Sequence, residues 1–228
     1  MLPFLLVVVG GSSGSIQPLI HLAKSLPAEF YATICMVIHI SAHDPSYFPE
    51  ILGRAGPLPA TQAQHLERVE SGHVYCAPPG HHVLVENGHF RTTTGPKENG
   101  VCPAIDILFR SAVQEEGSNV IGVVLLGLLD DGASGLWAIR DAGGITVVQD
   151  PNAAEYDSMP RSALDHVDVD YTVRGQDLAS LLIELVSESA QWRLEVEATI
   201  KARGLLDPLT WPSERGQRTV RSATRRWL

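Results

Sequence analysis

Residues 4–15, FLLVVVGGSSGS, decide the fold. Residues 4–9 form a continuous apolar run rich in valine, which is typical of a strand buried on both faces. The glycine- and serine-rich stretch that follows ends this strand in a tight turn, and apolar residues at helical spacing begin at Ile16. A strand, a glycine-rich turn and a helix in this order predict the first unit of a parallel α/β sheet.

The same alternation recurs along most of the chain. Further strands are predicted over 31–40, 120–126, 145–148 and 169–173, and helices over 132–142 and 160–167. The middle of the chain differs, because its strand-like runs are short and Asn87-Gly88 is a strong hairpin signal between the runs 82–86 and 89–93; a further short run spans 72–77. We therefore expect a doubly wound, mostly parallel, Rossmann-like α/β sheet with helices on both faces and an antiparallel hairpin at one edge.

The C-terminal part of the chain has a different character. A long amphipathic helix is predicted over 177–202, and beyond Gly204 the proline, glycine and arginine content removes the periodicity. We expect one main domain over 1–175, a C-terminal helix over 176–204 and a basic, poorly ordered tail over 205–228.

Composition limits the class of protein. The 228 residues are 44% hydrophobic and 19% charged, which is typical of a globular domain and excludes a disordered chain, a collagen-like repeat and a coiled coil. Three cysteines (Cys35, Cys76 and Cys102) are too few for a disulfide framework. Residues 1–9 lack the basic start and the cleavage site of a signal peptide, and are too short to span a bilayer. We expect a cytoplasmic protein without membrane insertion.

The net charge of −9 is unevenly distributed. Residues 201–228 hold seven cations against two acids, so the remaining 200 residues are strongly acidic. An acidic body argues against nucleic acid as the main partner.

Three polar groups follow predicted strands. Ser12 and Ser13 follow the first strand, His39 closes the second, and Asp131 follows the strand over 120–126. The carboxyl ends of parallel strands meet at one edge of a sheet, so a hydroxyl, an imidazole and a carboxylate can form a nucleophilic site there. Residues 10–14 also match the G-x-S-x-G pattern of an exposed nucleophilic serine. Taken singly, the glycine-rich stretch can also be a plain tight turn or, as the poorer fit, a phosphate-binding loop. His39 by itself can be a core histidine, and Asp131 a helix cap.

A metal site is the weaker interpretation of the histidines. His39 and His43 are four residues apart, but residues 41–45 have the composition of a loop leading into a helix, unlike the helical H-E-x-x-H motif. The sequence contains no Cys-x-x-Cys pair, and the glycine-rich turn lacks the lysine of a P-loop. We expect no metal and no cofactor.

Several segments in a fixed order carry a more specific signal. These are VVVGGSSGS, IHISAHDP, GHVYCAPPGHHVLVENG, GPKEN, PAIDILFRSA, GVVLLGLLDDGASGL and GGITVVQDPNAAEYDSMPRSAL. Over residues 4–173 the chain resembles the catalytic domain of the CheB family of chemotaxis protein-glutamate methylesterases. The resemblance implies a carboxylic ester hydrolase of signal transduction that cleaves glutamyl γ-methyl esters on chemoreceptor helices, often with glutamine deamidation as a second activity.

Residue by residue, the resemblance implies a catalytic triad of Ser12, His39 and Asp131. The backbone N–H groups of Ser13 and Leu128 match the family's oxyanion hole. Four more side chains fall on segments near the family's site and are candidates for substrate binding: His81, His82, Met159 and Arg161.

The chain also departs from the family pattern. Family members commonly begin with a phosphoacceptor receiver domain, and we expect this chain to act without one. Val101-Cys102 stand before Pro103 where the family usually has His-Arg, which favours a second possibility, a serine esterase of the same fold acting on another ester or amide. A third possibility is a non-catalytic signalling module that keeps the fold for binding. The sequence leaves the oligomeric state open.

Overall fold

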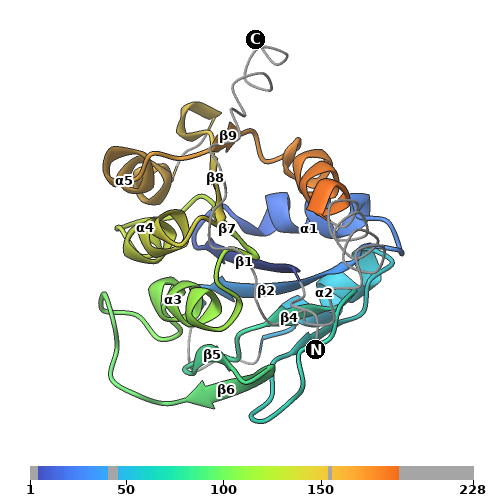
Figure 1. The fold of residues 1–228 in the computed structure, drawn as a ribbon. Helices are drawn as coiled ribbons and strands as arrows, with labels where there is room; N and C mark the ends of the chain where they lie inside the picture. Colours follow the sequence, from blue (N-terminus) through green and yellow to red (C-terminus); the bar gives the residue numbers. More distant parts are fainter. Residues whose placement is uncertain (1–4, 41–45, 154–155, 190–228) are drawn as a thin grey trace, which may run out of the picture. The chain divides into compact units, whose positions relative to one another are not determined.

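The structure is a computed structural model that describes residues 5–40, 46–153 and 156–189. Its main sheet has seven parallel strands in the order β3-β4-β2-β1-β7-β8-β9 (Figure 1). The strands are β1 (Leu5–Gly11), β2 (Ala32–Ile38), β3 (Ala60–Gln62), β4 (Val74–Cys76), β7 (Val120–Val124), β8 (Ile145–Gln149) and β9 (Tyr171–Val173). The predicted doubly wound parallel sheet is confirmed.

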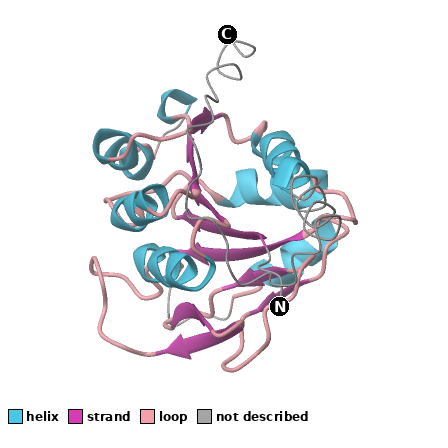
Figure 2. Cartoon of the chain, in the orientation of Figure 1, coloured by secondary structure: helices cyan, strands magenta, loops and turns pink. Residues whose placement is uncertain are grey.

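Helices cover both faces of this sheet, as Figures 1 and 2 show. One face carries α1 (Ile16–Ser25), α2 (Phe48–Ala55) and a helical stretch over 178–189; the other carries α3 (Ile105–Glu116), α4 (Ala133–Asp141) and α5 (Ser158–His166). A short 3-10 turn spans Pro151–Ala153. The rest of the helix predicted over 177–202, and the tail, lie outside the described residues, so the three-part division of the chain stays a prediction.

The core follows from the alternation of side chains along the buried strands. In β1, Val7 and Val9 point toward the α1 side and pack in a cluster that includes Leu182, whereas Leu6 and Val8 point to the opposite face and pack with α3 and α4. Every residue of β1 and β2 is buried. A strand covered on both faces needs an uninterrupted apolar run, and this requirement explains why residues 4–9 were diagnostic.

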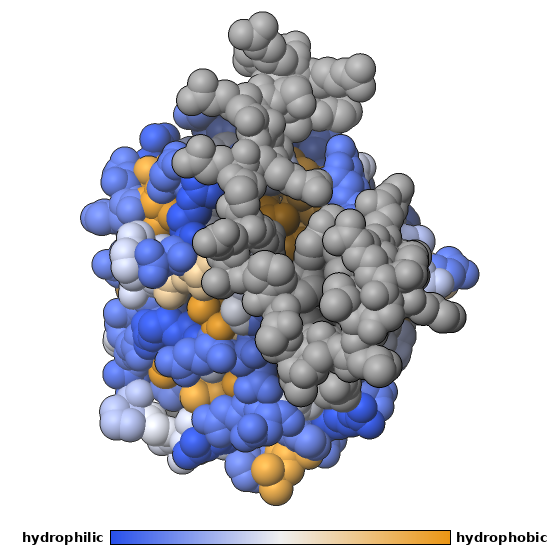
Figure 3. Space-filling view, viewed as in Figure 1, coloured by the Kyte–Doolittle hydropathy of each residue, from blue (hydrophilic) through white to orange (hydrophobic). Residues whose placement is uncertain are grey.

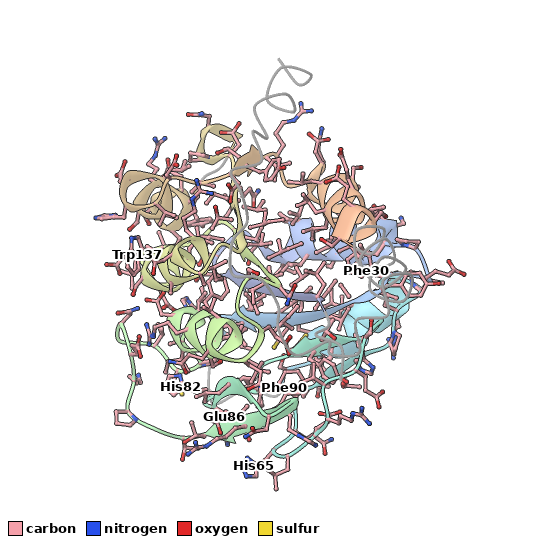
Figure 4. All side chains as sticks on the ribbon, in the orientation of Figure 1. Phe30, His65, His82, Glu86, Phe90 and Trp137 are labelled. Atoms are coloured by element: carbon pink, nitrogen blue, oxygen red, sulfur yellow. The ribbon has the colours of Figure 1, made fainter. Side chains whose placement is uncertain are left out.

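The hairpin is confirmed, and the structure refines its position. Its strands are β5 (His82–Glu86) and β6 (His89–Thr93), but they form a two-stranded sheet of their own instead of extending the edge of the main sheet. The reason is their packing on α3. The Val85 N–H donates to Ser111 Oγ of α3 at 3.1 Å, and Phe90 is fully buried. Figure 4 labels His82 and Phe90 in the region of the hairpin, and the Phe90 ring also contacts Tyr75 of β4.

Three elements were not predicted or were displaced. The three-residue strand β3 and the helix α3 were missed, and the helix expected to follow residues 41–45 begins at Phe48. β3 is too short for its periodicity to be recognised. Helix α3 contains a buried aspartate and a buried serine on its core side, which interrupts the apolar stripe that marks a helix.

The surface of the described residues is mainly polar. On the face in Figure 3 the hydrophobic areas are small and separate, and Trp137, 56% exposed, projects outward from α4 (Figure 4). Among the described helices, none combines the length and apolar character that crossing a membrane requires.

The contact between α1 and α2 generates a stability prediction. A Cβ on Gly56 would lie 1.8 Å from the carbonyl oxygen of Ala23, whereas the nearest atom to a Cβ on Gly53 is 3.7 Å away. Gly56→Ala should therefore lower the free energy of unfolding by about 1–3 kcal/mol through overpacking. Gly53→Ala, inside α2, should raise it by roughly 0.5–1 kcal/mol through helix propensity. Urea unfolding of both variants tests this contrast, and equal effects would contradict it.

Candidate active site

Ser12 and His39 lie side by side at the carboxyl ends of adjacent strands. The last pair of the β1–β2 register is Gly11 with Ile38, and the His39 N–H donates to the Gly11 carbonyl at 3.1 Å. On the other side of β1, the Ser12 N–H donates to the Leu126 carbonyl just beyond β7, at 2.9 Å. The strand order reverses between β1 and β7, and such a reversal is where open α/β sheets bind ligands.

A tight turn holds the serine at this point. Ser15 is fully buried, and its Oγ donates to the Ser12 carbonyl at 2.6 Å. The backbone at Gly127 approaches from β7 so closely that a Cβ there would lie 2.2 Å from Met159 Sδ and 2.7 Å from Ser12 Cβ. Glycine at 127 is therefore a condition for the observed position of Ser12.

His39 bonds to Asp131 across the site. Its Nε2 lies 2.9 Å from Asp131 Oδ2, and the side-chain exposures are 12% for His39 and 1% for Asp131. The ring nitrogen that remains for a neighbouring group is Nδ1. In the described part of the chain no hydrogen bond joins Ser12 Oγ to this ring, and such bonds are often formed only when substrate is bound.

Asp131 is held by more than the histidine. Its carboxylate also accepts the backbone N–H groups of Ile105 at 2.7 Å and Asp106 at 3.2 Å, and the side-chain amide of Asn99 at 2.9 Å. Burial by itself would raise the pKa of Asp131, but the hydrogen bonds from His39, Ile105, Asn99 and Asp106 outweigh it and lower the pKa. Asp131 is thus a fixed negative charge next to His39.

Asp131 does cap a helix, but the helix is α3 and not α4, which follows Asp131 in the chain. Asp131 precedes α4, yet the N–H groups it accepts belong to the first turn of α3. Asp106 of α3 in turn accepts the N–H groups of Gly132 at 3.1 Å and Gly135 at 2.6 Å, at the start of α4. The two aspartates cap each other's helices. Sequence reasoning assigned nothing to Asp106 or Asn99, because their partners lie 25 and 32 residues away in the chain.

Two backbone N–H groups next to Ser12 are available to a ligand. Among the described residues, the amides of Ser13 and Leu128 donate to no other group. The neighbouring Gly127 is anchored on both sides, since its N–H donates to the Tyr156 carbonyl at 2.9 Å and its carbonyl accepts the Met159 N–H at 3.1 Å. Free amides on an anchored backbone suit the stabilisation of an oxyanion.

A cleft of about 380 Å³ opens next to His39. Its lining is His39, Ile40, Gly80, Gly95, Lys97, Gly100, Val101, Cys102 and Pro103. A hollow of about 500 Å³ between the hairpin and α3 is larger, but its lining includes none of Ser12, His39 and Asp131. The smaller cleft is therefore the candidate substrate site.

The four side chains predicted to bind substrate lie in different environments. His82 is 1% exposed, with Nδ1 accepting the Ala104 N–H at 3.1 Å and Nε2 donating to the Pro96 carbonyl at 3.0 Å, which favours a structural role. His81 is half-buried and its Nδ1 donates to the Pro79 carbonyl. Met159 lies beneath Gly127 and is 1% exposed. Arg161 is exposed and bonded to Asp157 at 2.6 Å.

Within the described residues, no group of three or more histidine, cysteine or carboxylate side chains is arranged to hold a metal ion. His43 lies outside those residues.

A parallel α/β sheet that holds a serine, an imidazole and a buried carboxylate at neighbouring strand ends is typical of serine hydrolases. Comparison with known proteins specifies the family. The family model described as CheB methylesterase matches residues 7–182, so the chain belongs to the CheB methylesterase family.

Individual relatives agree with this assignment. A putative protein-glutamate methylesterase/protein-glutamine glutaminase of Leptospira interrogans is 37% identical over 188 residues, covering 82% of this chain and 97% of that protein. A protein-glutamate methylesterase/protein-glutamine glutaminase of Syntrophus aciditrophicus is 34% identical, and the match covers 82% of this chain but only 54% of the relative. The crystal structure of the Thermotoga maritima CheB methylesterase catalytic domain superposes with a TM-score of 0.75 at 29% identity, covering 80% of this chain and 98% of that one.

The lowered pKa of Asp131 generates a prediction about stability and pH. A carboxyl whose pKa is lowered by folding contributes stability above its unfolded pKa of about 3.9 and loses it as the pH falls through the folded value. Asp131→Asn should cost about 1–3 kcal/mol of unfolding free energy at pH 7, because an amide cannot accept all of these N–H groups. The cost should shrink below about pH 4.

Urea unfolding at pH 7 and at pH 3 measures this difference. Asp130→Asn is the matched control, since Asp130 is the exposed neighbour and should change the unfolding free energy by less than about 0.5 kcal/mol. A cost for Asp131→Asn that stays the same at both pH values would contradict the prediction.

Proposed function

We propose that this chain hydrolyses glutamyl γ-methyl esters on chemoreceptor proteins, giving glutamate and methanol, with Ser12, His39 and Asp131 as its catalytic triad. The observation that carries the proposal is the 2.9 Å contact between His39 and buried Asp131, beside Ser12 at the β1–β7 reversal. Membership of the CheB methylesterase family and the printed names of the relatives support the substrate class.

In the first half-reaction, Ser12 Oγ attacks the ester carbonyl while His39 Nδ1 takes the hydroxyl proton. Asp131 stabilises the resulting imidazolium through Nε2 and holds the ring in the productive tautomer. The carbonyl oxygen becomes an oxyanion and accepts the N–H groups of Ser13 and Leu128, each typically worth about 3–4 kcal/mol in the transition state.

Collapse of this intermediate breaks the bond to the methoxy oxygen. His39 returns the proton to that oxygen, methanol leaves and a glutamyl ester of Ser12 remains. Water then attacks the acyl carbonyl, His39 takes one of its protons and passes it to Ser12 Oγ as that oxygen leaves. The product is a γ-carboxylic acid, which loses its remaining proton to the solvent and becomes the carboxylate. No step needs a metal or a cofactor.

Deamidation of receptor glutamines is the second activity in this proposal. The relatives' names pair methylesterase with protein-glutamine glutaminase, and an amide follows the same two half-reactions with ammonia as the leaving group. The proposed partners are methylated chemoreceptor helices, and the cleft of about 380 Å³ beside His39 has room for a glutamyl methyl ester side chain. His81, at the hairpin start, is a candidate contact to such a helix. The small cysteine content supports a cytoplasmic site of action.

Ser12→Ala should abolish methanol release from a methyl-esterified chemoreceptor fragment, lowering kcat/KM by at least about 10⁴-fold because no nucleophile remains. Ser13→Ala is the matched control. It removes an adjacent hydroxyl but keeps the backbone N–H, so its rate should stay within a few-fold of wild type. Gas chromatography of methanol measures both.

Other outcomes of the same assay discriminate between the alternatives. If p-nitrophenyl acetate is hydrolysed in a Ser12-dependent way but no methanol is released from the receptor, the proposed substrate is wrong and the serine mechanism is retained. Absence of any Ser12-dependent turnover on either substrate would favour the non-catalytic signalling module.

A further inference from the structure

A second buried carboxylate lies next to the one that contacts His39. Asp106 is 3% exposed and Asp131 is 1% exposed, and the Asp106 N–H donates to Asp131 Oδ1. The two carboxylates also contact one common atom, Asn99 Nδ2, at 2.9 Å each. Buried carboxylates that share a site tend to retain one proton, because the two ionised groups repel each other. Burial raises the pKa of Asp106, and the negative charge of Asp131 acts in the same direction.

Asn99 occupies the position between these two groups. Its Nδ2 lies 2.9 Å from Asp106 Oδ2 and 2.9 Å from Asp131 Oδ1. An amide nitrogen carries two hydrogens, so one can be donated to each carboxylate at the same time. Asn99 has a positive φ of 53°, a conformation that asparagine tolerates, on a turn closed by backbone hydrogen bonds between Glu98 and Val101.

The other charged or titratable groups around the pair do not replace this amide. His39, directly after β2, donates to Asp131. Arg110 of α3 pairs with Glu98, and Lys97 and Cys102, in the loop before α3, line the cleft beside His39. Among the described side chains, only those of His39 and Asn99 donate a hydrogen bond to either carboxylate.

We propose that Asn99 is a positioning residue that keeps Asp131 fully ionised against His39, by donating one hydrogen to each carboxylate so that Asp106 and Asp131 do not share a proton. This inference rests on the proposed function, since it assigns Asn99 a role in the basicity of the same histidine.

Removing the Asn99 amide should move the pH profile of kcat/KM in one definite direction. A proton shared between Asp106 and Asp131 lowers the negative charge facing His39, so the imidazolium form is stabilised less. His39 then takes up its proton at lower pH, and the acid limb of the kcat/KM profile moves to lower pH. The plateau of that profile falls as well, because the imidazolium formed in the transition state loses the same stabilisation.

Asn99→Gly removes the amide and tolerates the positive φ, so backbone strain does not confuse the result. With p-nitrophenyl acetate, the plateau of kcat/KM should fall by about 10- to 100-fold, less than the roughly 10⁴-fold loss expected when the triad carboxylate itself is lost. The acid limb should move down by about half a pH unit or more. An NMR titration of the His39 ring in the resting protein should show the same downward shift, whatever the activity.

Two further variants complete the design. Asn87→Gly is the matched control, because Asn87 has a φ of 52° in the β5–β6 turn and contacts neither carboxylate; it should leave the profile unchanged. In an Asp106→Asn background the proton cannot be shared, so adding Asn99→Gly should no longer move the acid limb. If Asn99→Gly does not fold, Asn99→Ser takes its place: a hydroxyl has one hydrogen and can donate to only one carboxylate, so the acid limb should again move to lower pH.

The outcomes separate this inference from the proposed function. An Asn99→Gly protein whose acid limb and His39 titration match wild type, or move to higher pH, would overturn the role of Asn99 while Ser12-dependent activity stands. A wild-type protein that releases no methanol from a methylated receptor contradicts the proposed substrate, yet the His39 titration still decides the role of Asn99.

Discussion

The reciprocal capping of α3 and α4 is the interaction on which the site depends. Both helices start in the protein interior, where their first N–H groups cannot reach water and must find other acceptors. Neither N-cap residue, Ala104 or Gly132, supplies a side-chain bond. Asp131 and Asp106 supply the acceptors from the opposite helix instead. The carboxylate that faces His39 is therefore held in place by the folding of two helices.

Close approaches of the backbone place Ser12, the proposed nucleophile, beside His39. Ser12 lies between strands that are parallel neighbours in the sheet, and glycine at 127 lets the β7 loop come within contact distance of it. Met159 fills the space beneath Gly127. Ser12 and the N–H groups of Ser13 and Leu128 are therefore next to a well-packed part of the core. An arrangement of donors supported in this way needs little reorganisation when charge develops on a bound ligand.

The parts of the fold that sequence predicted are those with strong local signals. The strand over 4–9, the Asn87-Gly88 hairpin and the helix over 132–142 are all present, with bounds shifted by a few residues. Helix α3 was missed because Asp106 and Ser111 interrupt its apolar stripe. The hairpin's separation from the main sheet was missed because it depends on packing against that same unpredicted helix.

The sequence by itself determined the α/β class and the three strand-end groups Ser12, His39 and Asp131, because hydrophobic periodicity and turn chemistry are local properties that the order of residues encodes directly. Only the tertiary structure decided which carboxylate oxygen meets His39 Nε2, that Asp131 caps α3, that His82 is fully occupied by backbone groups, and that Asn99 joins two aspartates. These contacts join residues far apart in the chain. Their partners are set by the order of strands and the packing of helices, which no local pattern records.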